Sequence, residues 1–180
     1  MKELSLNILD VAENSVKAGA KLTQILLEET DDNLTIIIED DGCGMDEETV
    51  KNVADPFYTT RTTRKVGLGV PLLKMAAEQT DGSFSIKSSV DDKDHGTSVK
   101  AQFNKNHLDY TPLGDVISSV TTLIQGHPDS DFLFSHKLEK GTVNLDTREI
   151  RQVLEDVPLN SYEVIKWIEE YLNEQYSEIA

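Results

Sequence analysis

Hydrophobic residues near the start of the chain recur first with a helical period and then with the two-residue period of strands. The sequence predicts a helix over residues 5–18 that ends before Gly19. Its apolar positions near the helical period are Leu6, Leu9, Ala12 and Val16, with Val11 off phase. Strands over 22–29 and 34–40 follow, and the turn TDDN joins them as a hairpin.

The pattern alternates between helix and strand up to about residue 104. A short helix over 45–55 with acids in its first turn leads to a loop over 56–66 and a second helix over 69–82. Two alternating segments, 83–90 and 96–103, read as paired strands joined by DDKDH. This part of the chain therefore has the mixed content of an α/β protein.

A polar connection from Asn104 to Thr111 separates this part from a different pattern. A helix over 112–124 is expected to bury Val116, Ile117, Val120, Leu123 and Ile124. The segments DFLFSHKL and TVNLD predict a hairpin around Gly141. Two capped helices follow, one opened by Asp146 with Glu149 and one by Asn160 with Glu163. The last helix is expected to bury Ile165, Ile168, Tyr171 and Leu172. We therefore divide the chain into a domain over 1–104 and a C-terminal helical and hairpin appendage over 105–180.

Composition and charge limit the partners of the protein. The 180 residues carry a formal net charge of −16, and each of the two parts contributes −8. A uniformly acidic surface repels nucleic acid and anionic lipid, so neither is expected as a main partner. The single cysteine, Cys43, excludes an internal disulfide, and the sequence has neither an 18-residue apolar stretch nor a signal peptide. The sequence therefore predicts a cytoplasmic protein.

The stretch EDDGCGMD, residues 39–46, places charge in a glycine turn directly after a strand. By itself it reads as a charged hairpin turn. A calcium loop is a poor alternative, because the sixth position counted from Asp40 is Met45, where such a loop requires glycine.

Three other stretches change the interpretation. They are LDVAENSVKAGA, with Asp10, Glu13 and Asn14, then PFYTTRTTRKVGLGVPLLK, and then HGTSVKAQF with Thr97. Together with D-x-G-x-G at 40–44, this ordered set resembles the GHKL superfamily, the ATP-binding domains of gyrase, the heat-shock-ninety chaperone, sensor histidine kinases and the mismatch-repair ATPase. The resemblance covers residues 4–103. It implies a Bergerat-type ATP fold, an α+β two-layer sandwich whose mixed, mostly antiparallel sheet is covered by helices.

The resemblance assigns the adenine end of the site. Asp40 accepts a hydrogen bond from the 6-amino group of adenine and rejects guanine, which has a carbonyl there. Gly42 and Gly44 let backbone lie close to the ring, and Asp41 is the exposed neighbour. Thr97 helps to hold adenine through water.

The resemblance also assigns the phosphate end, with ATP and Mg²⁺ as cofactors. Asn14 is the Mg²⁺ ligand, because an amide oxygen is a hard, neutral donor. Gly67 and Gly69 open a helix whose backbone N–H groups approach phosphate. The basic loop forms a lid with cations that neutralise the phosphates. The full set of ATP-binding residues is Asn14, Asp40, Gly42, Gly44, Met45, Thr59, Thr60, Arg61, Arg64, Lys65, Gly67, Leu68, Gly69, Val70 and Thr97.

The catalytic residues are where the resemblance is weakest. Hydrolytic members of the superfamily carry a glutamate at the position of Asp10, which is one methylene shorter, so Asp10 is the first candidate for a general base and Glu13 the second. HLDYTPL, with His107, is similar to the phosphoacceptor motif of sensor kinases but lacks the acid directly after the histidine. His127 and His136 are expected at the surface.

Three functions remain open at this point. A protein kinase of the histidine or anti-sigma serine type is placed first, a non-catalytic ATP-sensing module second, and a slow ATPase switch third. The C-terminal part is expected either to dock a protein partner or a second copy, or to extend the core by covering a face of the sheet.

Overall fold

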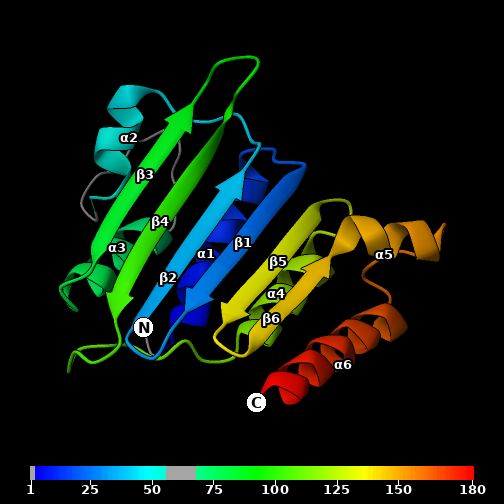
Figure 1. Ribbon diagram of the computed structural model, residues 1–180. Coiled ribbons are helices and arrows are strands. Elements are labelled where there is room, and N and C mark those ends of the chain that lie inside the picture. Colours follow the sequence, from blue (N-terminus) through cyan, green and yellow to red (C-terminus); the bar gives the residue numbers. More distant parts are fainter. Residues whose placement is uncertain (1–2, 56–67) are drawn as a thin grey trace.

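The computed structural model describes residues 3–55 and 68–180, and its centre is one six-stranded sheet in the order β3-β4-β2-β1-β5-β6 (Figure 1). The first elements are α1 (Leu4–Lys17), β1 (Leu22–Glu29), β2 (Asn33–Asp40), α2 (Glu47–Val53), α3 (Gly69–Glu78), β3 (Ser83–Ser89) and β4 (Gly96–Asn104). The C-terminal elements are α4 (Val116–Gly126), β5 (Asp131–Leu138), β6 (Gly141–Asp146), α5 (Thr147–Leu154) and α6 (Tyr162–Ile179).

The sheet is mixed and mostly antiparallel, as predicted. Four neighbouring pairs are antiparallel, and only β1 and β5 run parallel. In Figure 1, α1, α3 and α4 lie behind the sheet. Alternate strand residues such as Ile25, Ile36 and Phe134 are fully buried on that side. This arrangement confirms the two-layer α/β sandwich.

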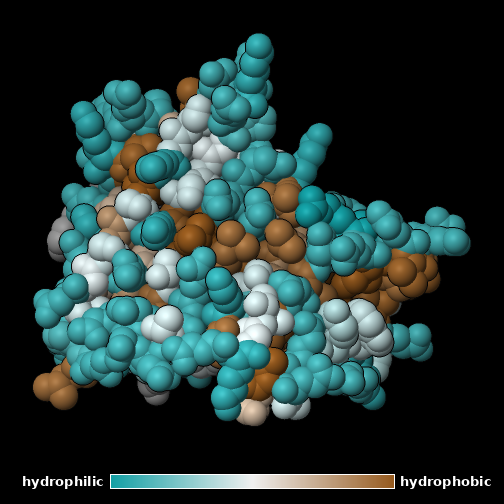
Figure 2. All heavy atoms as spheres, viewed as in Figure 1, coloured by the Kyte–Doolittle hydropathy of each residue, from teal (hydrophilic) through white to brown (hydrophobic). Residues whose placement is uncertain are grey.

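The opposite face of the sheet carries no helix among the described residues. Its strands expose polar side chains around a small apolar centre, where Leu26 pairs with Ile37 across β1 and β2 and Leu133 lies on the neighbouring β5. Figure 2 shows this centre as brown atoms surrounded by teal ones. The three side chains are half-buried, because the strands themselves shield much of their surface.

The buried face of α1 differs from the predicted one. Leu4, Ile8, Val11 and Ala12 are buried, whereas Leu6 is 44% exposed. The helix packs both on the sheet and beside α4, so partly buried Leu9 and Val16 lie at the edge of the core. Because α1 has apolar residues on two sides, the sequence pattern alone does not show which side faces the core. The packing of α1 on the sheet determines which side is buried.

The C-terminal region is integrated more closely than an appendage. β5 pairs with β1 from Leu22↔Asp131 to Glu28↔Lys137, and β6 continues the sheet beyond it. Its core residues belong to the same hydrophobic cluster as those of the first hundred residues. The boundary near residue 104 is therefore a change in sequence pattern within one continuous sheet.

The connection before α4 also provides hydrogen-bond acceptors for the N-terminus of α1. Leu4 donates its N–H to the carbonyl of Pro112 at 2.9 Å, and Ser5 donates to Leu113 at 2.8 Å. These bonds satisfy two of the free N–H groups at the start of α1, which has no side-chain cap. The next helix begins four residues later than predicted, because α4 starts at Val116 with Asp115 as its N-cap.

The last helix closes the β6 edge of the sheet. Its N-cap is Ser161, one residue after the predicted Asn160, whereas Asp146 caps α5 as predicted. Gln175 accepts from the N–H of Asn144 and donates to its carbonyl, both at 2.9 Å, and so pairs with β6 as a strand would. Covering an edge in this way protects it from pairing with another chain.

A buried polar network ties α6 to the sheet, and it overturns the prediction that His136 lies at the surface. His136 is 2% exposed; its Nδ1 lies 2.7 Å from Tyr176 Oη and its Nε2 lies 2.8 Å from Glu29 Oε1. Lys105 donates to Glu29 Oε2 at 2.7 Å. The hydrogen bond from His136, followed by the contact with Lys105, lowers the pKa of Glu29 to about 2.

This network predicts a specific loss of stability in acid. The folded pKa of Glu29 lies below its reference value of 4.5, so its contribution is present above pH 4.5 and is lost as the pH falls toward 2. We expect roughly 2–3 kcal/mol of unfolding free energy to disappear in that window, and Glu29→Gln to remove that part of the dependence. Urea unfolding from pH 6 to pH 2.5 measures it. Glu28→Gln, at the exposed neighbouring position, is the control, and parallel curves for wild type and Glu29→Gln would contradict the prediction.

Candidate nucleotide-binding site

The carboxylate of Asp40 stands at the end of β2 and is held by three elements. Ser15 of α1 donates its hydroxyl to Oδ2 at 2.7 Å. The backbone N–H groups of Gly42 and Thr97 donate to Oδ1 at 2.9 and 3.3 Å. Since a carboxylate offers about four acceptor positions, Oδ2 keeps one for a ligand. Asp40 is therefore fixed in orientation and still able to accept a hydrogen bond.

The loop after β2 packs closely against the scaffold. A Cβ on Gly42 would lie 2.9 Å from the Cβ of Ala18, and a Cβ on Gly44 would overlap the carbonyl of Ser89. Gly44 also has a φ of 75°, which side chains other than glycine adopt with strain. Both glycines are thus needed to fit the loop between α1 and β3.

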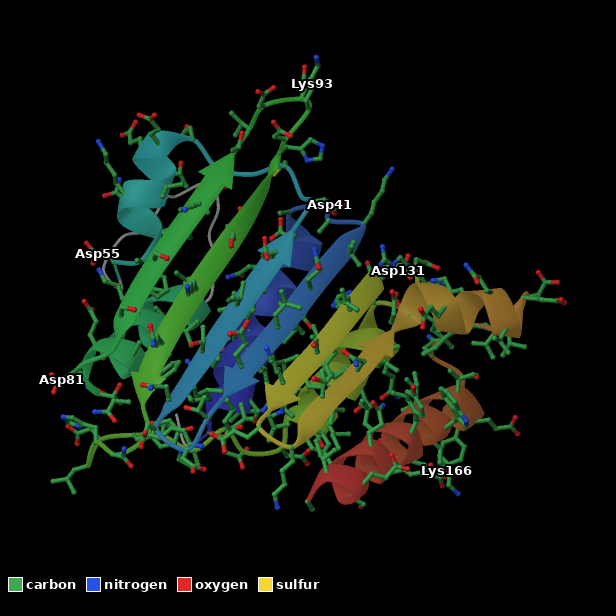
Figure 3. All side chains as sticks on the ribbon, viewed as in Figure 1. Asp41, Asp55, Asp81, Lys93, Asp131 and Lys166 are labelled. Atoms are coloured by element: carbon green, nitrogen blue, oxygen red, sulfur yellow. The ribbon has the colours of Figure 1, made fainter. Side chains whose placement is uncertain are left out.

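Asp41 does more than occupy an exposed position. Its Oδ1 accepts the N–H groups of Lys21 and Leu22 at 2.7 and 3.0 Å. This pair of bonds fixes the start of β1 beside the end of β2. Figure 3 labels Asp41 at this end of the sheet.

A chain of hydroxyl contacts joins the loop to β4. Met45 donates its N–H to Ser88 Oγ at 2.8 Å, and that oxygen lies 2.7 Å from Thr97 Oγ1. Thr97 is directly opposite Asp40 in the β2–β4 register. The structure thus brings together the four residues assigned to the adenine end, Asp40, Gly42, Gly44 and Thr97, and places Met45 of the predicted ATP-binding set beside them.

At the other end of the site, Asp10 and Asn14 are four residues apart and share one flank of α1. Asp10 touches the start of α3, since a Cβ on Gly69 would lie 2.8 Å from the Cβ of Asp10. Desolvation and then the charge of Glu13 raise the pKa of Asp10, while Lys17 opposes the shift. A carboxylate with a raised pKa is a better proton acceptor.

Glu13 is turned toward a different neighbour. Its Oε2 lies 2.8 Å from Nε2 of His127, the residue that follows α4. At about 100° per residue, Glu13 lies about 100° around α1 from Asn14, on the flank that faces α4. The geometry therefore gives Glu13 a contact between helices and leaves Asp10 beside Asn14.

The start of α3 is only partly in the described range. Leu68 is 54% exposed and provides no side-chain cap for the first N–H groups of α3. Val70 is 4% exposed and belongs to the hydrophobic core, which places its side chain away from a ligand. Thr59, Thr60, Arg61, Arg64, Lys65 and Gly67 lie outside the described residues.

The residues present fit a magnesium ion better than a transition metal. Among residues 3–55 and 68–180, no three His, Cys, Asp or Glu side chains are grouped to hold a metal. Asn14 offers one hard amide oxygen, and Mg²⁺ commonly takes one or two protein oxygens and completes its shell with water and phosphate.

His107 lies at the wrong end of the sheet to receive phosphate from this site within one chain. It follows β4, whereas Thr97 stands near the start of that strand. Its Nε2 is 3.6 Å from Oδ2 of Asp81, which Figure 3 labels at the end of the molecule opposite Asp41. Strands rise about 3.3 Å per residue, so the length of β4 separates the two positions by roughly 25 Å.

Sequence reasoning missed two residues of the site, Ser15 and Ser88. Ser15 follows Asn14 directly and is 4% exposed, so a small polar side chain on the buried face of α1 was the available signal. Ser88 lies in a serine-rich strand in which no serine stands out. His95, at the end of the DDKDH connection between β3 and β4, places Nδ1 2.6 Å from the carbonyl oxygen of Gly42.

The fold and this geometry define an ATPase-type nucleotide-binding domain. Residues 2–107 match the family model described as "Histidine kinase-, DNA gyrase B-, and HSP90-like ATPase". The match spans more than half of the 180 residues, and the chain belongs to this family. The resemblance drawn from the four motifs is confirmed.

Solved structures share the fold over most of the chain. The MutL ATPase domain of Aquifex aeolicus, complexed with ADP, has a TM-score of 0.56 and 14% identity, covering 86% of this chain and 70% of that one. The N-terminal domain of a DNA repair protein has a TM-score of 0.55 and 16% identity, covering 81% and 52%. Both structures cover more of this chain than the family match over residues 2–107 does. The similarity of fold therefore extends into the C-terminal region.

Similar curated proteins are sensor kinases. The signal transduction histidine-protein kinase AtoS of Escherichia coli is 33% identical over 88 residues, which are 49% of this chain and 14% of AtoS. Sporulation kinase C of Bacillus subtilis is 30% identical over 88 residues, 49% of this chain and 20% of that protein. The chain thus matches at most a fifth of the length of these two relatives.

No helix in the described part of the chain is both long enough and apolar enough to cross a bilayer.

The close fit of the loop predicts a strong effect of one methyl group. Gly44→Ala should lower the free energy of unfolding by about 2 kcal/mol or more, because the methyl group meets the Ser89 carbonyl at a positive φ. Gly126→Ala, with open space around the added atom, should stay within about 0.5 kcal/mol of wild type. Urea unfolding compares the two variants, and equal stabilities would show that the loop tolerates displacement.

Proposed function

We propose that the protein binds ATP with Mg²⁺ and transfers the γ-phosphate to a protein side chain in signalling, as a histidine-kinase-like or serine-kinase-like domain. The observation that carries the proposal is the Asp40 carboxylate, fixed by Ser15, Gly42 and Thr97 with an acceptor position left on Oδ2. Family membership adds the expectation that the ligand is an adenine nucleotide.

Adenine selection follows from the polarity of Asp40. An ionised carboxylate only accepts hydrogen bonds, so it pairs with the 6-amino group of adenine and repels the 6-carbonyl of guanine. A site that presents a fixed polar group rejects an analogue that cannot pair with it, because the buried partner is left unsatisfied. Thr97, held by Ser88, is the second polar group beside the base.

The phosphates are assigned to the flank of α1 that carries Asn14 and Asp10. Asn14 is the proposed Mg²⁺ ligand, and the uncapped start of α3 offers N–H groups to phosphate oxygens. The ion would neutralise charge on the phosphates and orient them. Asp10, whose pKa is raised by burial, is the proposed general base for a substrate hydroxyl or water.

Transfer to a separate protein is preferred over transfer to His107 of the same chain. His107 and Asp40 lie at opposite ends of the sheet. Within one chain they could meet only if β4 separated from its neighbouring strands. We place the acceptor on a partner that docks through residues 105–180, and we propose a cytoplasmic location without nucleic acid as a partner.

A non-catalytic ATP sensor is the second candidate. Asp10 has one methylene less than glutamate, so its carboxylate reaches less far from α1. If that reach is too short for chemistry, the same site still binds nucleotide and reports it to a partner. A slow ATPase switch is the third candidate.

Nucleotide selectivity is tested by thermal unfolding. ATP with Mg²⁺ at a hundred times its Kd should stabilise the protein by about 2.7 kcal/mol, and GTP should give no shift. Asp40→Asn should lose the ATP effect, whereas Asp92→Asn, at an exposed position of the β3–β4 turn, should keep it. Equal shifts with ATP and GTP would contradict the role of Asp40.

Phosphotransfer is tested with γ-labelled ATP and cell extract, following labelled protein and free phosphate together. Asp10→Asn should lower transfer by about 10²-fold or more while the ATP shift remains, because only proton removal is affected. Glu13→Gln is the matched control and should stay close to wild type, since Glu13 contacts His127. Retained nucleotide binding without label in either product would favour the sensor.

A further inference from the structure

The C-terminal helices carry an unusual share of exposed aromatic surface. Ten large hydrophobic side chains are exposed in the described part of the chain, and five of them lie between Val153 and Tyr171. Trp167 and Tyr171, 49% and 38% exposed, are stacked with ring centroids 4.9 Å apart and an interplanar angle of 9°. The sequence had suggested that Tyr171 belongs to the core; instead it stacks on Trp167 at the surface.

The stacked pair is displayed by a helix that is firmly attached. Val164, Ile165, Ile168 and Leu172 are buried on the adjacent flank of α6, roughly a quarter turn around the helix from the aromatic pair. The bond from Tyr176 to His136 and the paired bonds from Gln175 to Asn144 add two polar anchors. The two rings are therefore exposed while α6 is packed in its place against the sheet.

Acidic side chains surround the pair on the same flank. Residues three, four or seven positions from Trp167 or Tyr171 share their side of the helix, and they include Glu163, Glu170, Glu174 and Glu178. None of these four forms an ion pair with another described residue. Lys166, labelled in Figure 3, is the only base of α6. We name this surface, Trp167 and Tyr171 with the four glutamates, the aromatic–acidic stripe.

A second copy of the chain is a poor occupant for the stripe. A symmetric dimer places the same patch on both sides, so four glutamates would face four others. Like charges opposed in this way cost free energy and select against the contact. The protein also carries a net charge of −16, which attracts a basic partner from a distance.

We propose that the aromatic–acidic stripe docks a protein partner through a segment rich in arginine. A guanidinium group stacks on aromatic rings and at the same time pairs with carboxylates, and both are presented here on one rigid helix. The inference specifies the protein partner of the proposed function. It involves no nucleotide, so it can fail while ATP binding is retained, and the reverse also holds.

The test uses the fluorescence of Trp167, the only tryptophan of the chain. The probe is a synthetic sixteen-residue helical peptide with four arginines on one face, and a peptide with glutamines at those positions is its control. Wild type should bind the arginine peptide with a saturable change in emission that weakens as salt increases. The glutamine peptide should give no saturable change.

Two charge-matched variants separate the stripe from general acidity. Glu170→Gln with Glu174→Gln should weaken peptide binding about fivefold, since each exposed ion pair contributes about 0.5 kcal/mol. Asp92→Asn with Asp94→Asn removes the same charge from the β3–β4 turn, far from α6 in Figure 3, and should change binding less than twofold. Tyr171→Ala should weaken binding by a similar factor to the glutamate variant.

Three outcomes would overturn the proposal. Equal weakening by the two charge variants would mean that only the overall charge attracts the peptide. A wild-type emission that the arginine peptide leaves unchanged would mean that the stripe does not bind it. Sedimentation of wild type as a dimer that Trp167→Ala converts to a monomer would make a second copy the occupant.

Discussion

The hydrogen bonds that converge on Asp40 are the constraint on which the rest of the site depends. Ser15 connects the carboxylate to α1, Gly42 to the following loop, and Thr97 to β4. Each of these elements also supplies another part of the candidate nucleotide site: Asn14 and Asp10 from α1, Gly44 and Met45 from the loop. A shift of any one element would therefore change both the orientation of the carboxylate and the distance from the base to the phosphate end.

The C-terminal region supports this arrangement from the opposite side. The carbonyls of Pro112 and Leu113 satisfy the start of α1, and His127 holds Glu13 near its end. β5 continues the sheet beyond β1, so the helix that carries Asn14 packs within a single core. The same region then presents α6 outward. One segment thus positions the nucleotide site and carries the surface proposed for the partner.

Local patterns were sufficient for most elements but not for how they assemble. The alternation in 22–29 and 34–40 and the turn between them predicted β1 and β2 closely, because strand and turn preferences act over a few residues. The phase of α1 and the burial of His136 could not be obtained in the same way. Each depends on neighbours far along the chain, α4 for the helix and Tyr176 and Glu29 for the histidine.

By itself, the sequence determined the strands, the helices, the acidic surface and the motif residues Asp40, Gly42, Gly44 and Asn14, because each is encoded in a short window of side chains. Only the tertiary structure decided that β5 pairs with β1, that Glu13 contacts His127, and that Ser15 and Ser88 hold the site together. Hydrogen bonds and packing between segments 20 to more than 100 residues apart have no signature in a local pattern. They arise only when the sheet brings those segments within a few ångströms of one another.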